Sequence, residues 1–148
     1  MSGIPGSGKS YHSLKLVRES PTTTVVVSTD AIREEMGYTI SGENWDNKRE
    51  KRMWSILINR VIEFSDAYKT VIVDCTAVTN KRRKWMYDHF NKLFDNFELH
   101  IIDCPLNKAI EQDGLRERHV PHSAIARMSY IFEQPDDFVE THFKIIRI

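Results

Sequence analysis

The sequence predicts an α/β fold of three layers, in which helices flank a parallel β-sheet. Short β-branched runs such as Val25–Val27 and Val71–Val73 alternate with segments of helical periodicity, which is typical of βαβ units. The segment Gly3–Ser10 fits G-x-x-x-x-G-K-[ST], the phosphate-binding loop (P-loop) that joins a strand to a helix. With 148 residues, a single domain over 1–148 is expected.

The P-loop predicts that the chain binds a nucleotide. Its glycines let backbone N–H groups curl around a phosphate, and the helix that begins near Gly8 adds its positive end. Lys9 offers a mobile charge to the outer phosphates, and the Ser10 hydroxyl suits Mg²⁺. The expected nucleotide contacts are Gly3, Pro5, Gly6, Ser7, Gly8, Lys9 and Ser10.

The start of the chain departs from the usual pattern. A P-loop follows a buried strand of about five residues, whereas only Met1 and Ser2 precede Gly3. Three explanations remain open: the sequence lacks the first strand, the strand is vestigial, or another chain supplies it.

The remaining elements follow from periodicity and turn signals. Met53, Leu57, Val61 and Phe64 recur at helical spacing in a long helix. In the helix after the P-loop, Tyr11, Leu14, Leu16 and Val17 are candidates for the buried side. Expected helices are Lys9–Ser20, Asp30–Met36, Asn47–Tyr68, Thr79–Phe94, Leu106–Asp113 and Ser123–Glu133, and expected strands are Thr22–Ser28, Val71–Val73, Phe97–Ile102 and Phe143–Ile148, with loops over Gly37–Asp46 and Gly114–Pro121.

Composition sets broad limits. The formal net charge is zero, so any nucleic-acid surface must be local. Two cysteines are too few for a disulfide framework, and a reducing cytoplasm is the expected setting. No apolar run approaches membrane-spanning length, so no membrane partner is expected.

Asp30 and Arg33 are candidates for chemistry just beyond the predicted strand Thr22–Ser28, because ligands gather beyond the carboxyl ends of parallel strands. Asp30 is placed to accept a proton from an attacking hydroxyl, or alternatively to cap the helix that follows. Arg33 lies one turn later and suits an acceptor phosphate, or alternatively an exposed ion pair with Glu34 or Glu50.

Two further sets are candidates for binding the nucleotide. Asp74 ends a buried strand, the usual place for an acid that holds Mg²⁺ together with Ser10, although it also suits capping of the next turn. Arg116 and Arg118 lie in the connector at about 114–121, which could close as a lid over the nucleotide or remain a solvated loop.

Two basic runs suit nucleic-acid backbone or, alternatively, ordinary solvated helix faces. They are Lys48–Arg52 and Lys81–Lys84. The second is the better candidate because it closely follows Asp74.

Four segments in order resemble the kinase domain of phage-type polynucleotide 5′-hydroxyl kinases: Gly3–Ser10, Ser28–Arg33, Val71–Thr76 with Arg82-Arg83, and Arg116–Pro121. The resemblance implies a P-loop kinase fold with a lid, in the cytoplasm of a cell or of a virus's host. It implies ATP and Mg²⁺ as cofactors, and transfer of the γ-phosphate to a 5′-OH end of DNA or RNA.

The resemblance also implies roles for single residues. Lys9 and Ser10 match the phosphate and Mg²⁺ residues, Asp30 the general base, and Arg33 the contact to the acceptor phosphate. Asp74 matches the acidic strand-end residue, and Arg116 or Arg118 the lid arginine. The sequence departs from the family pattern at Tyr11, at Ala77 and in the missing first strand.

Two other functions stay open. One is a small-molecule kinase that acts on a nucleoside, a sugar or an antibiotic, which the zero net charge favours. The other is a nucleotide-binding protein without catalytic activity.

Overall fold

The computed structural model describes residues 1–39, 44–116 and 119–148. The chain divides into two compact units. Residues 1–10 and 76–148 form one, called the P-loop unit here, and residues 11–75 form the other, called the Asp30 unit. The division falls inside helix α1 (Lys9–Glu19), which begins in the P-loop unit and continues in the Asp30 unit.

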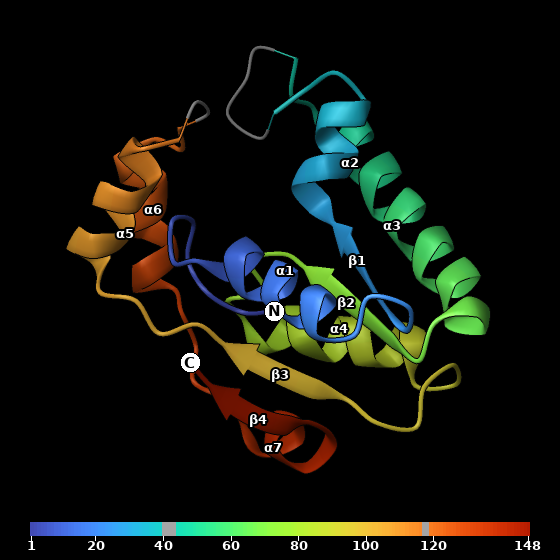
Figure 1. Ribbon diagram of the computed structural model, residues 1–148. Coiled ribbons are helices and arrows are strands. Elements are labelled where there is room, and N and C mark those ends of the chain that lie inside the picture. The colour runs from blue at the N-terminus through green and yellow to red at the C-terminus, as the bar shows by residue number, and fades with distance from the viewer. Residues whose placement is uncertain (40–43, 117–118) are drawn as a thin grey trace. The chain divides into compact units, whose positions relative to one another are not determined.

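Among its described residues, the Asp30 unit contains most of α1, a parallel strand pair and two further helices. Strand β1 (Thr24–Ser28) pairs with β2 (Thr70–Asp74) in a register that sets Ser28 opposite Asp74. Helix α2 (Thr29–Glu35) follows β1 directly, and the long helix α3 (Asn47–Ala67) packs against both strands (Figure 1). The apolar spacing predicted for α3 is confirmed, because Met53, Leu57 and Val61 are buried.

The P-loop unit contains the second parallel pair. Strand β3 (Glu98–Ile101) pairs with β4 (Lys144–Arg147). Helix α4 (Asn80–Phe90) packs against α7 (Asp137–His142), and α5 (Leu106–Gly114) packs against α6 (His122–Tyr130) (Figure 1). Helix α7 was not predicted. Its six residues are too few for a periodic signal, and the Asp136 side chain caps it by accepting from Val139 N–H at 3.0 Å.

Ser2 occupies the place of a strand before the P-loop. It forms a one-residue parallel bridge to Ile101: its N–H donates to the His100 carbonyl at 2.8 Å, and its carbonyl accepts from Ile102 N–H at 2.8 Å. Gly3 N–H donates to the Thr76 carbonyl at 3.4 Å. Within the described residues the strands therefore form two parallel pairs plus this bridge.

One core prediction is wrong. Tyr11 and Leu14 are 74% and 54% exposed, whereas Ser13 is fully buried. Residues 13, 16 and 17 share one face of a helix, and residues 11 and 14 point elsewhere. The apolar residues of α1 therefore do not all mark its buried side. Within the described ranges, no helix has both the length and the apolar character to cross a bilayer.

Candidate functional site

The P-loop is shaped by close packing on α5. A Cβ atom at Gly6 would lie 2.1 Å from the Ala109 carbonyl oxygen, so only glycine fits there. Gly8 has φ of 98°, a conformation that other residues rarely adopt. Ile4 anchors the loop in a cluster with Ala109 and Ile125.

Lys9 and Ser7 are the buried polar side chains of this loop. The Lys9 ammonium donates to the Ile4 carbonyl at 2.8 Å. The Ser7 hydroxyl is buried with no hydrogen-bond partner among the described residues. A buried unsatisfied hydroxyl is unfavourable unless a ligand completes it, and a phosphate oxygen is a suitable acceptor. Ser10, the next residue in α1, is exposed.

Asp30 is not the cap of its helix. Ser28 is the N-cap of α2, because its Oγ accepts from Ala31 N–H at 3.3 Å. The capping alternative for Asp30 is therefore wrong. Its side chain is 64% exposed, and one carboxylate oxygen accepts from Arg33 Nη1 at 2.8 Å.

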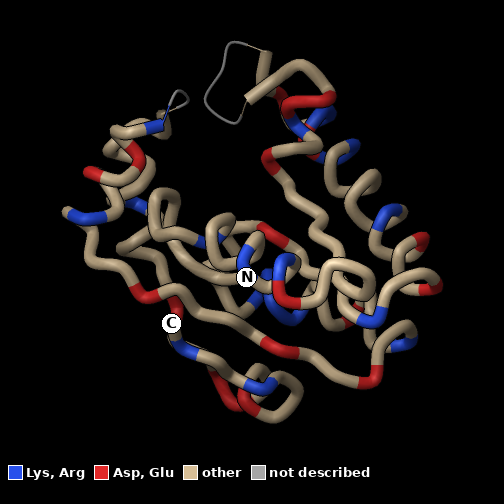
Figure 2. The backbone as a smooth tube through the Cα atoms, in the orientation of Figure 1, with Lys and Arg blue, Asp and Glu red and all other residues tan. Residues whose placement is uncertain are grey.

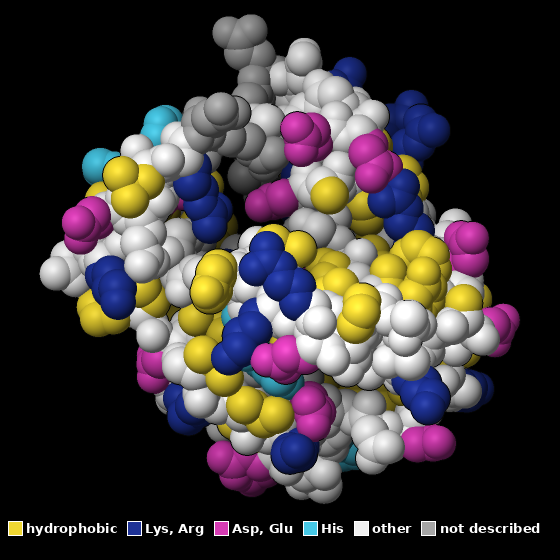
Figure 3. Space-filling view, in the orientation of Figure 1, with side chains coloured by type: hydrophobic (Ala, Val, Ile, Leu, Met, Phe, Trp, Pro, Cys, Tyr) yellow, Lys and Arg dark blue, Asp and Glu magenta, His cyan; other side chains and the backbone are white. Residues whose placement is uncertain are grey.

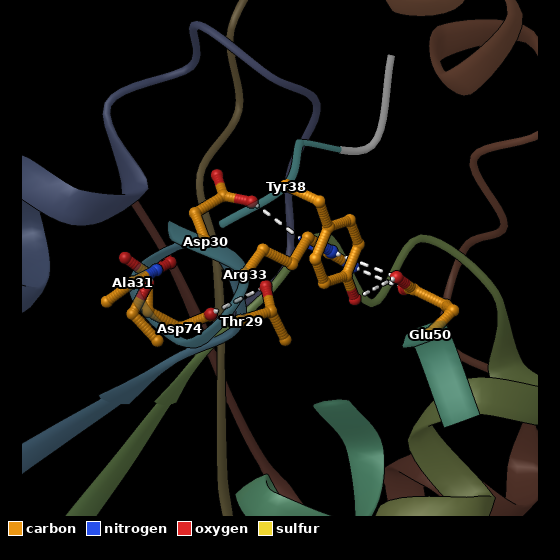
Figure 4. A network of polar contacts seen from close by, with 8 residues as sticks. Thr29, Asp30, Ala31, Arg33, Tyr38, Glu50 and Asp74 are labelled. Carbon is orange, nitrogen blue, oxygen red and sulfur yellow. Dashed lines mark hydrogen bonds and ion pairs between the residues drawn. The ribbon is translucent and has the colours of Figure 1, made fainter. Parts of the chain in front are cut away.

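Arg33 is buried, with 6% exposure, and lies between two carboxylates (Figure 4). Its Nε and Nη2 donate to the two oxygens of Glu50 at 3.1 and 2.5 Å, and Nη1 donates to Asp30. The Tyr38 hydroxyl donates to Glu50 Oε2 at 3.0 Å. The alternative of an exposed ion pair was correct about Glu50 as the partner and wrong about exposure, since α2 turns this side chain toward α3.

These contacts fix the orientation of the Arg33 guanidinium. A guanidinium has five N–H groups, and three of those of Arg33 donate to Glu50 and Asp30. Burial acts to lower the pKa of Arg33, but hydrogen bonding and charge from Glu50, with the charge of Asp30, raise it above the ordinary value. Arg33 is therefore a permanent cation.

Asp74 lies at the same sheet edge as this network. The backbone carbonyl of Asp74 accepts a hydrogen bond from Thr29 Oγ1 at 3.4 Å (Figure 4). Asp74 as a whole is buried. Since Ser28 and Asp74 pair in the strand register, Asp30 and Asp74 follow the carboxyl ends of neighbouring parallel strands. The predicted grouping of these two acids at one edge is therefore confirmed within the Asp30 unit.

The connector after α5 is organised by Asp113, a residue that the sequence analysis missed. Its backbone carbonyl accepts from Arg116 N–H at 3.1 Å and contacts His119 Nδ1 at 2.9 Å, and its Oδ2 accepts from Val120 N–H at 2.7 Å. Arg116 is exposed, and the Arg118 prediction lies outside the described residues. An aspartate shortly before a Gly-containing connector was a usable turn signal.

A family model described as an AAA domain matches residues 1–135. The chain belongs to the AAA domain family. Its fold is that of the P-loop kinases, with parallel strands flanked by helices.

Individual relatives of this AAA domain are distant. It is 25% identical to an L-seryl-tRNA(Sec) kinase of Methanococcus maripaludis, across 98% of this chain and 59% of that protein. A chain in the structure of the Pnkp1/Rnl/Hen1 RNA repair complex has a TM-score of 0.76 and 20% identity, over 97% of this chain and 44% of that one. A gluconokinase from Sinorhizobium meliloti 1021 has a TM-score of 0.66 and 15% identity, over 99% and 79%.

The AAA domain thus spans little more than half of its curated relative, and the acceptor differs among the similar proteins. Membership in a P-loop kinase family implies ATP binding, typically with Mg²⁺. The buried Ser7 hydroxyl, the Lys9 ammonium and the glycine backbone of the P-loop suit a triphosphate. Ser10 in the P-loop unit carries a hydroxyl and Asp74 in the Asp30 unit carries a carboxylate, which are ligand types that Mg²⁺ accepts.

Glu50 and Tyr38 are the other residues of the Arg33 network, and the sequence analysis did not place them in the site. Glu50 is the one acid within the run Lys48–Arg52, and that isolation was the available signal. Within the described residues, no group of three or more His, Cys, Asp and Glu side chains forms a metal site.

Proposed function

We propose that this domain transfers the γ-phosphate of ATP to the 5′-hydroxyl end of a polynucleotide. One observation carries the proposal: Ser28 and not Asp30 caps α2, and the exposed Asp30 carboxylate lies against Arg33, which donates to one of its oxygens. A positioned carboxylate of this kind suits a general base.

The roles follow from the chemistry of each side chain. Lys9 and the P-loop amides bind the phosphates of ATP. Ser10 and Asp74 would hold Mg²⁺, which would supply positive charge to those phosphates. Asp30 orients the attacking 5′-hydroxyl and accepts its proton. Arg33 binds the phosphate that follows the acceptor nucleoside. Arg116 and Arg118 stabilise the charge of the transferring phosphoryl group.

Removing the base tests the proposal directly. Asp30→Asn should lower the transfer rate at least about 100-fold and leave the Kd for ATP nearly unchanged. Glu34→Gln is the matched control, because Glu34 is an exposed acid on the same helix. The assay is transfer from γ-labelled ATP to 5′-OH RNA and DNA. Equal rates for Asp30→Asn and wild type would remove Asp30 from the mechanism.

A second candidate is a kinase for a small or tRNA-borne hydroxyl. The similarity to a seryl-tRNA kinase and to a gluconokinase favours it, as does the zero net charge of the chain. The same assay should therefore include seryl-tRNA, gluconate and a nucleoside panel. Transfer to one of these without transfer to any 5′-OH oligonucleotide would replace the leading proposal.

A further inference from the structure

The solvent face of α3 begins with a group of cations. At 100° per residue, Met53, Leu57 and Val61 mark the buried face, and Lys48, Lys51 and Arg52 lie on the opposite side and are exposed. We call these three residues the α3 basic face. Ser55 and Asn59 continue the same face without any acid.

The charges along α3 follow the ordinary preference only in part. Helices favour acids in the first turn and bases in the last, because of the macrodipole. The N-cap Asp46 and Glu50 in the first turn fit this preference. The cations of the first two turns do not, and neither do Glu63 and Asp66 near the end of α3, whose last turn has no base (Figure 2). The macrodipole therefore does not explain why these cations lie at the start of α3.

The three cations form no ion pair within the part of the chain that the structure describes. Arg49 pairs with Asp46 at 3.5 Å, and Arg60 pairs with Glu35. In contrast, no ion pair links Lys48, Lys51 or Arg52 to another described residue. The space-filling view shows Lys and Arg side chains exposed over the first part of α3 (Figure 3). The charge of this face is therefore available to a polyanion.

An exposed tryptophan stands beside these cations. Trp45 is 41% exposed and lies just before Asp46, the N-cap of α3. An aromatic ring next to a cationic track is the combination that binds single-stranded nucleic acid, through base stacking and backbone charge.

The α3 basic face is joined to Asp30 within one unit. Glu50 lies in the same turns of α3, on its inner side, and holds Arg33, which in turn holds Asp30. The face and the network are thus separated by about the 10–12 Å diameter of a helix. A 5′-OH dinucleotide has a single internucleotide phosphate, which Arg33 would bind, so it leaves no phosphate for the cations of the α3 basic face.

We propose that Lys48, Lys51, Arg52 and Trp45 bind the single-stranded polynucleotide whose 5′ end is presented to Asp30. The proposal deepens the proposed function and rests on it for the position of the 5′ end. The cations contact backbone phosphates downstream of the acceptor nucleotide, and Trp45 stacks on a base.

The rival basic run on α4 provides the matched control. Arg83 in that run is buried with 1% exposure and bonds to backbone carbonyls, and Arg82 and Lys84 lie over the rings of Trp85 and Phe138. The remaining exposed cations there resemble an ordinary solvated face. The sequence favoured this run as the nucleic-acid surface, and the structure favours the α3 basic face instead.

The test compares two triple variants of equal charge. One is Lys48→Gln with Lys51→Gln and Arg52→Gln. The other, called the α4 variant, is Lys81→Gln with Lys84→Gln and Lys92→Gln, in which Lys92 is an exposed lysine just beyond the end of α4. Fluorescence anisotropy with a labelled 5′-OH 12-mer of RNA gives the Kd over a range of KCl concentrations. Transfer kinetics are measured in parallel on the 12-mer and on a 5′-OH dinucleotide.

The α3 variant should bind the 12-mer at least about tenfold more weakly at 0.1 M salt. Its slope of log K against log salt should be smaller by about 2, since each lost phosphate contact on a single strand removes about 0.7. Trp45→Leu should weaken binding about tenfold, with little change in the slope. ATP binding and dinucleotide kinetics should remain at wild-type values.

Several results would overturn the proposal: an unchanged Kd for the α3 variant, equal loss in the α4 variant, equal loss on the dinucleotide, or no binding of the 12-mer by wild type at low salt. If the wild type bound the 12-mer through α3 but phosphorylated only a small molecule, the proposed function would fail while this surface remained. The binding and transfer measurements therefore separate the two failures.

Discussion

Two buried arginines, one in each unit, are held in opposite ways. Arg33 in the Asp30 unit donates to the carboxylates of Glu50 and Asp30. Arg83 in the P-loop unit donates to the carbonyls of Ala77 and Glu133 and to the neutral side chains of Asn80 and Ser2. Only Arg33 has a carboxylate in hydrogen-bonding contact.

The pKa values follow this difference. Burial lowers the pKa of Arg83, and the more distant charges of Glu133 and Asp136 only partly oppose it. For Arg33, Glu50 and Asp30 outweigh burial and raise the pKa. Arg83 therefore stabilises neutral groups of Ser2 and Ala77 by hydrogen bonds, whereas Arg33 forms ion pairs with Glu50 and with the exposed carboxylate of Asp30. We infer that Arg83 stabilises the fold and that Arg33 contributes to the chemistry.

The largest expected effect is that of Arg83→Met. The change leaves the carbonyls of Ala77 and Glu133 and the Ser2 hydroxyl without this donor inside the protein, so the free energy of unfolding should fall by at least about 3 kcal/mol. Urea denaturation measures it. The control Arg82→Met alters a neighbouring, less buried arginine and should have a much smaller effect; equal losses would contradict a special role for Arg83.

Glu50→Gln should affect activity more than stability. The change leaves Arg33 buried with Asp30 as its remaining carboxylate partner. Arg33 therefore binds the Asp30 carboxylate more tightly, and Asp30 accepts a proton less readily. We expect a loss of about 2 kcal/mol in stability and a fall of at least tenfold in the transfer rate. Rates and urea curves for Glu50→Gln, Arg33→Gln and the double variant form a double-mutant cycle.

The matched control is Glu35→Gln, whose partner Arg60 lies at the surface. This variant should change neither rate nor stability appreciably. Full additivity of Glu50→Gln and Arg33→Gln would show that the pair does not act as a unit.

Ser28→Ala should have an intermediate effect. The loss of the N-cap frays the first turn of α2, which carries Asp30, and should lower the free energy of unfolding by about 1 kcal/mol. Thr79→Ala removes the cap of α4, where Oγ1 accepts from Arg82 N–H at 3.3 Å, and should have a similar effect on stability. The rate with Ser28→Ala should stay well above that of Asp30→Asn, since the carboxylate remains. A rate as low as that of Asp30→Asn would assign the chemistry to Ser28.

The smallest effect concerns Tyr38 and alkaline pH. Burial, with the hydrogen bond and charge of Glu50, raises the pKa of Tyr38 from 10.0 to about 12. The folded state thus retains the phenol proton up to a higher pH than the unfolded state does. The contribution of the protonated Tyr38 to the free energy of unfolding is complete below pH 10 and is lost as the pH rises toward 12.

Tyr38→Phe should abolish the part of the decrease in the free energy of unfolding at alkaline pH that Tyr38 causes. It should also lower the free energy of unfolding at neutral pH by about 1 kcal/mol. Chemical denaturation between pH 8 and pH 11.5 measures both. Tyr130→Phe is the control, because Tyr130 is 90% exposed. Identical pH curves for wild type and Tyr38→Phe would show that Tyr38 does not couple to Glu50.

Local signals in the sequence were sufficient for the P-loop and most elements. The motif Gly3–Ser10 is continuous, and the β-branched runs around Val26 and Ile72 identify buried strands without any tertiary information. The same holds for α3, whose apolar spacing defines its buried face. The short helix α7 was not predicted, because six residues give no periodic signal.

The sequence by itself determined the fold class, the phosphate-binding motif and the acids that follow two parallel strands. Only the tertiary structure decided which of several similar polar residues does what: Ser28 rather than Asp30 caps α2, Glu50 rather than Glu34 holds Arg33, and Arg83 is buried while Lys48, Lys51 and Arg52 stay exposed. The physical reason is that caps and buried ion pairs depend on which side chains meet across elements. Pairs such as Arg33 and Glu50 are 17 residues apart in the chain, and no local pattern relates their orientations.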